Sequence, residues 1–203
     1  MILRVGVDQK YKTIAAALEV TTNGTEILVD VGVYREPLFI QKAVTIRSLV
    51  AKDDFTAIQS LEGDDNDTSG ATIHVTGCFS VVCDTPVKGA IRIIGFCIIC
   101  DAPDMFSFHA VLVSAGVVVI HNCSLSSSSG PVVATEHEGT KLIMQTCAIH
   151  SGAQGGILTA TNSCLSTRQI HCCKNAACGM ELREGGCAVL DDVVSTAMAI
   201  RVS

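Results

Sequence analysis

Few carboxylates in the second half of the chain could act as an acid–base pair. Asp191 and Asp192 are the adjacent pair of the repeat region, whereas no cluster of Asp residues accompanies the candidate bases Arg168 and Arg183. Hydrolysis of a sugar bond needs two carboxyl groups facing one substrate, about 5–10 Å apart. Neighbouring residues of a strand point to opposite faces, so these two aspartates could serve one site only if a bulge intervenes. We expect them in a turn or at a solvated edge.

Thiols are the second possibility, because the chain carries 11 cysteines. Cys97 and Cys100 have the C-x-x-C spacing of a zinc knuckle, but both residues between them are Ile. That pattern is typical of a strand, in which thiols three positions apart face opposite sides. No Lys, Arg or helix N-terminus adjoins Cys97, Cys123 or Cys147 to favour a reactive thiolate. We predict thiols that pack as small hydrophobic residues.

A second set of metal-ligand types lies around residue 172. The run His171, Cys172 and Cys173 is followed by a further thiol at Cys178. His150 and Cys147 are expected nearby on adjacent coils. One thiol of the run should point outward near a turn, but we favour a buried thiol beside an exposed histidine over a metal site. Glu136, His137 and Glu138 are interpreted as a solvated turn.

An acidic segment offers a calcium-loop pattern. Residues 65–70 match the first half of an EF-hand loop, but position 12 of that loop is Thr76 instead of the bidentate Glu that calcium requires. We interpret the segment as a solvated excursion or a contact for a basic partner. The sequence therefore predicts no catalytic residue, no cofactor and no metal site.

Charge and hydropathy exclude further classes of function. Lys and Arg number 14 against 20 Asp and Glu, and no basic stripe is present for phosphate contacts, so nucleic-acid binding is not expected. The first residues lack the apolar core and cleavage site of a leader. The longest uncharged apolar stretch, 110–120, is too short to span a bilayer. We expect a cytoplasmic protein without membrane insertion, whose cysteines stay reduced.

The elements that must position these residues are mostly strands. Val, Ile and Thr abound, which favours strands, while aromatic residues amount to 4% and Trp is absent, which suits a narrow interior. One helix is predicted over Thr13–Val20, with Asp8 or Thr13 as its cap and an Asn-Gly turn after it. Thr25–Val31 and Leu38–Ile46 then alternate like strands.

A repeat begins near residue 90. Its apolar segments carry cysteines at positions 97, 123, 147 and 172, with turn-forming clusters between them. A period of about 20–26 residues with short strands predicts a solenoid. We infer an all-β fold, a parallel β-helix in which each repeat is one coil, like side chains stack about 4.8 Å apart and the four thiols form a ladder.

The first 50 residues resemble the N-terminal cap of pectin-lyase-like right-handed β-helix proteins, and especially that of pectin methylesterases. The segments that carry the resemblance are 11–18, 24–29, 32–38 and 40–46. Later units such as Asn122–Leu125 resemble generic coils of the same superfamily. The resemblance implies a right-handed parallel β-helix of about six coils, whose open end is covered by a short N-terminal helix.

The expected organisation is a single domain over residues 1–203. Residues 1–23 form a cap strand and helix, and residues 24–203 form the coils, with an acidic insertion at 51–70. The resemblance also implies where chemistry would have to be. Pectin methylesterases use two carboxylates, an Arg and Gln donors, but their Gln-Asp-Thr-Leu segment is absent, because Gln145 is followed by Thr146.

In composition the chain looks more like the Cys-rich intracellular β-helix modules of eukaryotic F-box and Shc-binding proteins, which act in protein recognition. No F-box-like helical segment is present, so a ubiquitin-ligase role is not implied. The sequence predicts a non-catalytic structural or interaction subunit that scaffolds protein contacts in a larger intracellular assembly. The alternative is a carbohydrate-active enzyme, or a carbohydrate-binding remnant of one.

A partner is predicted for the last coil. Residues 198–202 still read as a strand, with no capping helix after them. An uncovered coil is an exposed sheet edge, which proteins normally cover. We expect a protein partner on the coil edge near Met198, Ile200 and Val202, with a homodimer as the other possibility.

Overall fold

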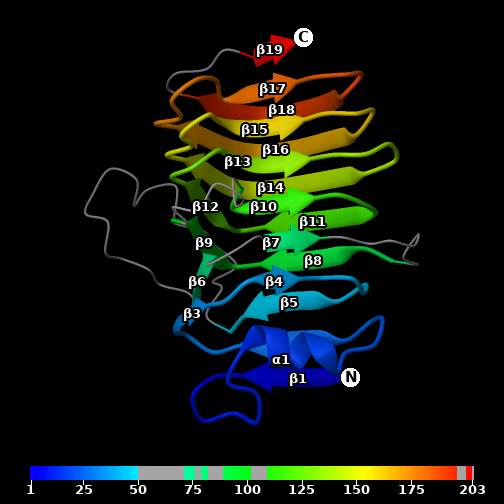
Figure 1. Cartoon of the computed structure of the whole chain (residues 1–203), viewed down its shortest axis with the longest axis vertical. Helices are drawn as coiled ribbons and strands as arrows, with labels where there is room; N and C mark the ends of the chain where they lie inside the picture. Colours follow the sequence, from blue (N-terminus) through cyan, green and yellow to red (C-terminus); the bar gives the residue numbers. More distant parts are fainter. Residues whose placement is uncertain (50–70, 76–78, 82–88, 102–108, 196–199, 203) are drawn as a thin grey trace.

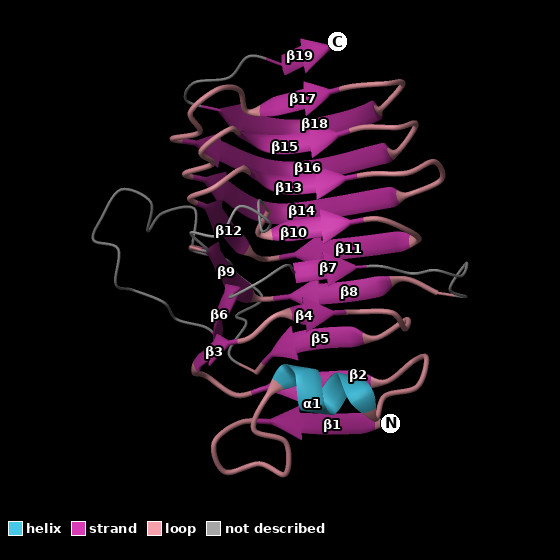
Figure 2. Ribbon diagram, viewed as in Figure 1, coloured by secondary structure: helices cyan, strands magenta, loops and turns pink. Residues whose placement is uncertain are grey.

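The computed structural model is a solenoid of parallel strands with about seven turns, against about six expected from the sequence. It describes residues 1–49, 71–75, 79–81, 89–101, 109–195 and 200–202. Figures 1 and 2 show the coils stacked along the long axis, with α1 at the N-terminal end and β19 at the opposite end. The predicted all-β parallel β-helix with a short N-terminal helix is confirmed.

Three stacks of strands form the faces of the solenoid. The first face contains β1 (Ile2–Val5), β2 (Glu26–Val29), β5 (Thr45–Ser48), β8 (Ile91–Ile94), β11 (Val117–His121) and the first halves of the long strands β14 (Lys141–His150), β16 (Cys164–Cys173) and β18 (Cys187–Ser195). The second face contains β3 (Val33–Arg35), β6 (Ala71–Val75), β9 (Phe96–Cys100), β12 (Ser124–Ser127) and the second halves of the same three strands. The third face contains β4 (Leu38–Phe39), β7 (Phe79–Val81), β10 (Val111–Val113), β13 (Pro131–Thr135), β15 (Gly155–Thr159), β17 (Met180–Leu182) and β19 (Ile200–Val202).

The register of the strands fixes the length of a coil. Leu142 of β14 pairs with Leu165 of β16, and Leu165 pairs with Ala188 of β18, so one coil there takes 23 residues. The same ladder places side chains of one kind above each other. Val118, Leu142 and Leu165 all point into the interior, where the first two are fully buried. Stacked aliphatic side chains therefore form the core, as the composition predicts.

The corner between the first and second faces requires a left-handed backbone. Gly95, Asn122, Thr146, Gln169 and Asp192 follow directly after residues that are in register, and all five have φ between 51° and 79°. Gly and Asn adopt this region readily, whereas a β-branched Thr does so only at a cost in free energy. The strands β14, β16 and β18 continue through the corner, so that each contributes to two faces.

Helix α1 (Ile14–Glu19) covers the N-terminal end of the interior. Thr13 caps it, because its hydroxyl accepts a hydrogen bond from the Ala16 N–H at 3.2 Å. The buried carboxylate of Glu36 accepts the N–H groups of Ile14 and Ala15, both at 2.8 Å. Ile14 and Ala17 are fully buried against the first coils. The predicted helix and Thr13 cap are thus confirmed.

The single strand expected over Leu38–Ile46 is wrong. The structure divides this segment into β4 on the third face and β5 on the first, with a turn at residues 40–44 between them. The alternation remained visible in the sequence because Leu38, Ile40 and Ile46 all point into the same interior from different faces. A solenoid interior therefore mimics the one-sided burial of a single long strand.

The four-thiol ladder is also wrong in its register. Cys97 pairs with Ser124 instead of Cys123, and Cys172 pairs with Ile149 instead of Cys147. The coil at β9 is longer than the coils after it, and Cys172 lies two positions further along its strand. Of the four, Cys123 and Cys147 occupy equivalent corner positions, each followed by residues in register.

Several predictions fall on residues outside the described ranges. They are the acidic insertion at 51–70, the calcium-loop pattern at 65–70 with Thr76, and Met198. None of the helices described is long and apolar enough to cross a membrane.

Candidate functional site

A row of polar side chains runs along the outside of the first face, immediately before the corner. This outer row comprises His121, Gln145, Arg168 and Asp191, which are in register on β11, β14, β16 and β18. Adjacent strands lie about 4.8 Å apart, so the row places four different polar groups at regular intervals. Arg168 Nε lies 3.8 Å from Asp191 Oδ2, and their side chains are 67% and 71% exposed. Water screens such an ion pair, which contributes about 0–1 kcal/mol.

The corner brings Asp191 and Asp192 to the same side of the molecule. Both are exposed, because Asp192 has a left-handed backbone with φ 51° and its side chain does not turn inward. The corner exposes both carboxylates without a bulge, because Gln169 and Asp192 take equivalent left-handed positions in the paired strands β16 and β18. Neither aspartate is desolvated, and the nearest basic partner of Asp191 is an exposed arginine. The pair lacks the burial with which proteins prepare a carboxyl group for acid–base catalysis.

The interior thiols serve packing and local hydrogen bonding. Cys123 and Cys147 are fully buried, and each donates to the carbonyl two residues before it, at 3.3 and 3.2 Å. Burial raises the pKa of Cys97 to about 11 and that of Cys123 and Cys172 to about 12. Burial likewise raises the pKa of Cys147. These thiols stay protonated at neutral pH, as predicted for small hydrophobic residues.

The metal-ligand types around residue 172 lie on two successive coils, with His150 of β14 in register with Cys173 of β16. Cys172 and Cys173 are both buried, which corrects the expectation that one thiol points outward. His171 is half-buried instead of exposed, and both its ring nitrogens are shielded from solvent and have no hydrogen-bond partner. His150 contacts the Ser124 hydroxyl at 3.1 Å. Within the described residues, no group of three His, Cys, Asp or Glu side chains could hold a metal ion.

The turns that leave the third face enclose a shallow hollow of about 430 Å³. Its charged lining consists of Glu136, His137, Glu138, Arg183 and Glu184. His137 and Glu138 are exposed, as expected for a solvated turn, and Glu136 is half-buried. Thr161 donates to the Glu184 carboxylate at 3.1 Å and so fastens two successive turns.

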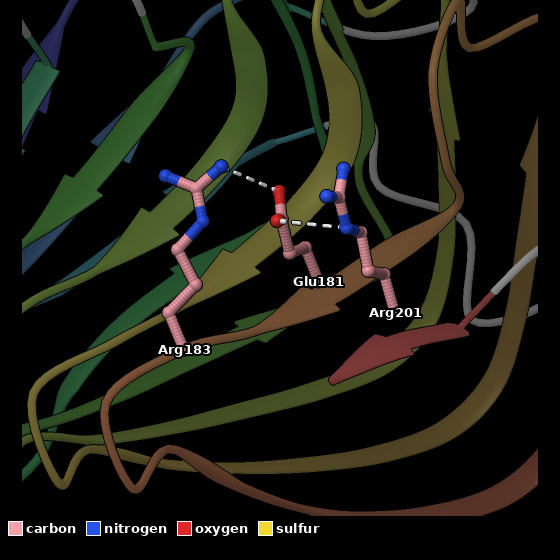
Figure 3. A network of polar contacts seen from close by, with 3 residues as sticks. All are labelled: Glu181, Arg183 and Arg201. Atoms are coloured by element: carbon pink, nitrogen blue, oxygen red, sulfur yellow. Dashed lines mark hydrogen bonds and ion pairs between the residues drawn. The ribbon is translucent and has the colours of Figure 1, made fainter. Parts of the chain in front are cut away.

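A carboxylate shared by two arginines lies on the third face of the last coils. Glu181 of β17 has a side chain that is only 12% exposed, and Arg183 Nη2 lies 2.9 Å from its Oε2. Arg201 of β19 approaches its other oxygen at 3.9 Å. Figure 3 shows the carboxylate between the two guanidinium groups. Because β17 and β19 pair in register at Glu181 and Arg201, this network fastens β19 to the coil below.

Apolar side chains are exposed on the same coils, on the outside of β18 and at the inward positions of β19, which stack on Met180 and Leu182. Val189, Val194, Ile200 and Val202 are all exposed, Val202 by 76%. The inward residues of β18 are less well covered than those of earlier coils, since Ala188, Leu190 and Val193 are only partly buried. Among the described strands, β18 hydrogen-bonds to β16 alone and β19 to β17 alone. Within the described residues, the C-terminal edge therefore presents apolar side chains and two strands that pair on one side only.

Comparison with known proteins relates the architecture to one group of enzymes. No family model and no curated protein matches the sequence. The pectin methylesterase of Aspergillus niger, in a form deglycosylated to an N-acetylglucosamine stub, superposes with a TM-score of 0.58 at 16% identity, over 99% of this chain and 74% of the enzyme. The pectin methylesterase PemA of Erwinia chrysanthemi gives 0.50 at 16% identity, over 94% and 67%.

The chain has the pectin-lyase-like right-handed β-helix fold. The predicted resemblance of fold is thereby confirmed. At this level of identity the comparison concerns the path of the backbone, and side chains must be argued from this chain alone.

Sequence reasoning missed two features of the C-terminal coils. Cys164 and Cys187 were not singled out, although their separation of 23 residues equals one coil and places them in register. The outer row was missed as a row, because His121 and Gln145 become neighbours only through the 24-residue coil between β11 and β14. Knowledge of the coil length would have revealed both.

Proposed function

We propose that this chain is a non-catalytic β-helix subunit that binds another protein chain along its C-terminal edge, the end of the solenoid formed by β18 and β19. The observation that carries the proposal is the combination at this edge of exposed apolar side chains and strands with one described neighbour each. The partner is a protein that offers an extended strand with apolar side chains. The proposal also places the chain in a reducing, cytoplasmic setting, consistent with its free cysteines.

The apolar side chains supply a reason for the edge to be covered. Val189 and Val194 of β18 are 69% and 56% exposed. Ile200 and Val202 of β19 are also exposed, because no described strand covers these inward positions. Removing apolar surface from water stabilises a complex by about 25 cal/mol per Å². A partner that packs here would also complete the burial of Leu190 and Val193, which face the interior.

The backbone of the edge supplies direction and specificity. A strand with unpaired N–H and C=O groups can accept a further strand, and such strand addition is a recurrent mode of protein recognition. β19 pairs in register with β17, and Arg201 lies 3.9 Å from the Glu181 carboxylate, so the backbone of the edge is aligned for a further strand. Preorganisation of this kind lowers the entropic cost of binding.

The polar sites of the chain support a binding role over catalysis. The outer row holds one carboxylate, which is exposed and paired with Arg168. The interior thiols are protonated and inaccessible. The Ser124 hydroxyl lies 3.1 Å from His150 Nε2, but neither residue lines the hollow described above.

The test compares two matched valine substitutions at opposite ends of the solenoid. Val202→Asp introduces a charge at the C-terminal edge, and Val7→Asp introduces the same charge at a loop that is equally exposed. Both tagged variants and the native chain are expressed at native level in the source cells, purified and analysed by cross-linking and mass spectrometry. We expect a stoichiometric partner with the native chain and Val7→Asp, and at least about tenfold less with Val202→Asp.

Light scattering of the purified chain distinguishes the identity of the partner. A stable dimer that Val202→Asp dissociates would make the partner a second copy of the chain. A stoichiometric partner that survives Val202→Asp unchanged, or no partner at all, contradicts the proposal.

A carbohydrate-directed activity is the second candidate, because Asp191, Asp192 and Arg168 gather on one exposed surface of a β-helix fold whose neighbours are pectin methylesterases. The activity is measured as methanol released from methyl-esterified pectin by the purified chain. Release that Asp191→Asn abolishes, with Lys141→Gln on the same face as a control, would replace the non-catalytic proposal. We expect no release above the buffer blank.

A further inference from the structure

Two thiols face each other on the outside of the first face. Cys164 is the first residue of β16 and Cys187 the first residue of β18, and the parallel register pairs them directly. Neighbouring parallel strands lie about 4.8 Å apart, which falls within the Cα separation of about 4.4–6.8 Å that a disulfide needs. Their sulfur atoms are 2.6 Å apart, about half an ångström more than an S–S bond. Little backbone movement is therefore needed to join them.

Accessibility distinguishes Cys187 from the other described thiols, and register places Cys164 beside it. Cys187 is exposed and Cys164 is half-buried, whereas Cys123, Cys147 and Cys172 lie in the interior. The hydrogen bond with Cys164 raises the pKa of the Cys187 thiol and so lowers its thiolate fraction at neutral pH, and the proximity of the two sulfur atoms is what favours their joining. An oxidant in solution can reach Cys187 first, and Cys164 lies within bonding distance of the product.

We propose that Cys164 and Cys187 form a reversible redox site, which a small-molecule disulfide such as oxidised glutathione converts into an intrachain disulfide. The Cys187 thiolate attacks one sulfur of the oxidant, whose S–S bond breaks and releases one thiol after it takes up a proton. Cys164 then loses its proton and attacks the Cys187 sulfur, which releases the second thiol. Two protein thiols are thus oxidised while one disulfide is reduced to two thiols.

The bond would join two successive coils at the start of their strands. It closes a loop of one coil and fastens β18, the outermost strand of the first face in the described structure, to β16. A cross-link of this size limits the unfolded chain and raises the stability of the folded one. The redox site does not depend on the proposed partner, because it needs only the two thiols and their register.

The experiment equilibrates the full chain with defined ratios of reduced and oxidised glutathione, blocks free thiols with iodoacetamide and maps peptides after trypsin. Cleavage at Lys141, Arg168, Arg183 and Arg201 places Cys187 alone in peptide 184–201, and Cys164 with Cys147 in peptide 142–168. We expect these two peptides to be linked, with fragmentation assigning the bond to Cys164. The oxidised chain should melt roughly 5 °C or more above the reduced chain.

Three variants make the result decisive. Cys164→Ser should retain glutathione on Cys187 at about ten times the native level, because no second thiol resolves the mixed disulfide. Cys187→Ser should show neither the linked peptides nor the shift in Tm. Cys97→Ser, which removes another half-buried thiol, should behave as the native chain does. Glutathione that accumulates equally on native Cys187 and on Cys164→Ser, or a bond assigned to Cys147, overturns the proposal.

Discussion

The two ends of the solenoid differ in how they close the interior. At the N-terminal end, α1 covers the first coils, and residues such as Val5 and Ile27 are fully buried. The buried Glu36 carboxylate and the Thr13 hydroxyl satisfy the first N–H groups of that helix. At the C-terminal edge the corresponding inward residues, Leu190 among them, are only partly buried.

This difference shows that stacking alone does not complete a β-helix core. Each coil buries its inward side chains against the coils on both sides, so a coil with one neighbour leaves them half covered. At the N-terminal end a short helix covers the inward side chains, and Thr13 and Glu36 cap that helix. Among the described residues, the C-terminal edge still offers apolar surface, and the proposed protein contact would cover it as α1 covers the other end.

Alkaline pH should have the largest effect, and it acts on the closed interior. Folding raises the pKa of Cys97, Cys123, Cys147 and Cys172 above the ordinary thiol value of 9.0. The unfolded chain therefore releases protons first, so stability is complete below pH 9 and is lost as the pH rises toward the folded values. We expect a loss of about 4 kcal/mol between pH 9 and pH 10, measured by urea unfolding.

A single thiol tests the origin of that loss. Cys123→Ser keeps a donor for the His121 carbonyl but does not ionise in this range. It should reduce the loss between pH 9 and pH 10 by about 1 kcal/mol. An unchanged pH dependence would show that other groups cause it.

Matched truncations compare the two ends directly. Ile27→Ala removes a fully buried side chain near the capped end and should cost about 3–4 kcal/mol in the free energy of unfolding. Leu190→Ala removes a partly buried side chain and should cost about 1–2 kcal/mol. Urea denaturation of both variants at pH 7 measures the difference. Equal costs would mean that the C-terminal edge is as closed as the N-terminal end.

Substitution of Glu36 tests how much the hydrogen bonds that cap α1 contribute to the stability of the N-terminal end. Glu36→Ala leaves two N–H groups of α1 without their buried acceptor and should cost about 2–3 kcal/mol. Glu36→Gln retains one acceptor oxygen and should cost about half as much. Hydrogen exchange at Ile14 and Ala15 should accelerate in both variants, and unchanged exchange would contradict the capping role.

A substitution at the corner should have the smallest effect, and it should raise the free energy of unfolding. Thr146 has φ 52°, where a β-branched residue is strained, and Asn122 already occupies the equivalent corner of the coil before. Thr146→Asn should raise the free energy of unfolding by about 1 kcal/mol. Thr45→Asn, in the extended strand β5, should lower it instead. Thermal melts of the two variants should therefore shift in opposite directions.

The fold could be predicted from the sequence because its signals are local and repeated. Thr13 and the alanines after it indicate the helix, and the recurring apolar segments indicate coils. The register could not be predicted with the same accuracy. Cys97 and Cys123 looked equivalent by spacing, but the coil that separates their strands takes 27 residues, so Cys97 stands opposite Ser124.

The candidate sites were harder to predict because they depend on register. The outer row and the Cys164–Cys187 pair exist only when strands from successive coils are aligned to the residue. The exposure of both Asp191 and Asp192 depends on the left-handed backbone of Asp192. An Asp-Asp dipeptide does not by itself predict that conformation. Partial burial of Leu190 depends on what lies above it in space.

The left-handed corner has a consequence for how the molecule could change in length. Since each corner residue stands at the same point of its coil, a whole coil can be removed or duplicated while every remaining side chain keeps its face. A duplication of residues 142–164 would lengthen the solenoid by about 4.8 Å and leave the ladders on both sides in step. An insertion of one residue within a strand would instead move the following inward side chains to the outer face. The unit of insertion and deletion in this fold is therefore the whole coil, and each added coil extends the surface of the solenoid by one strand on each face.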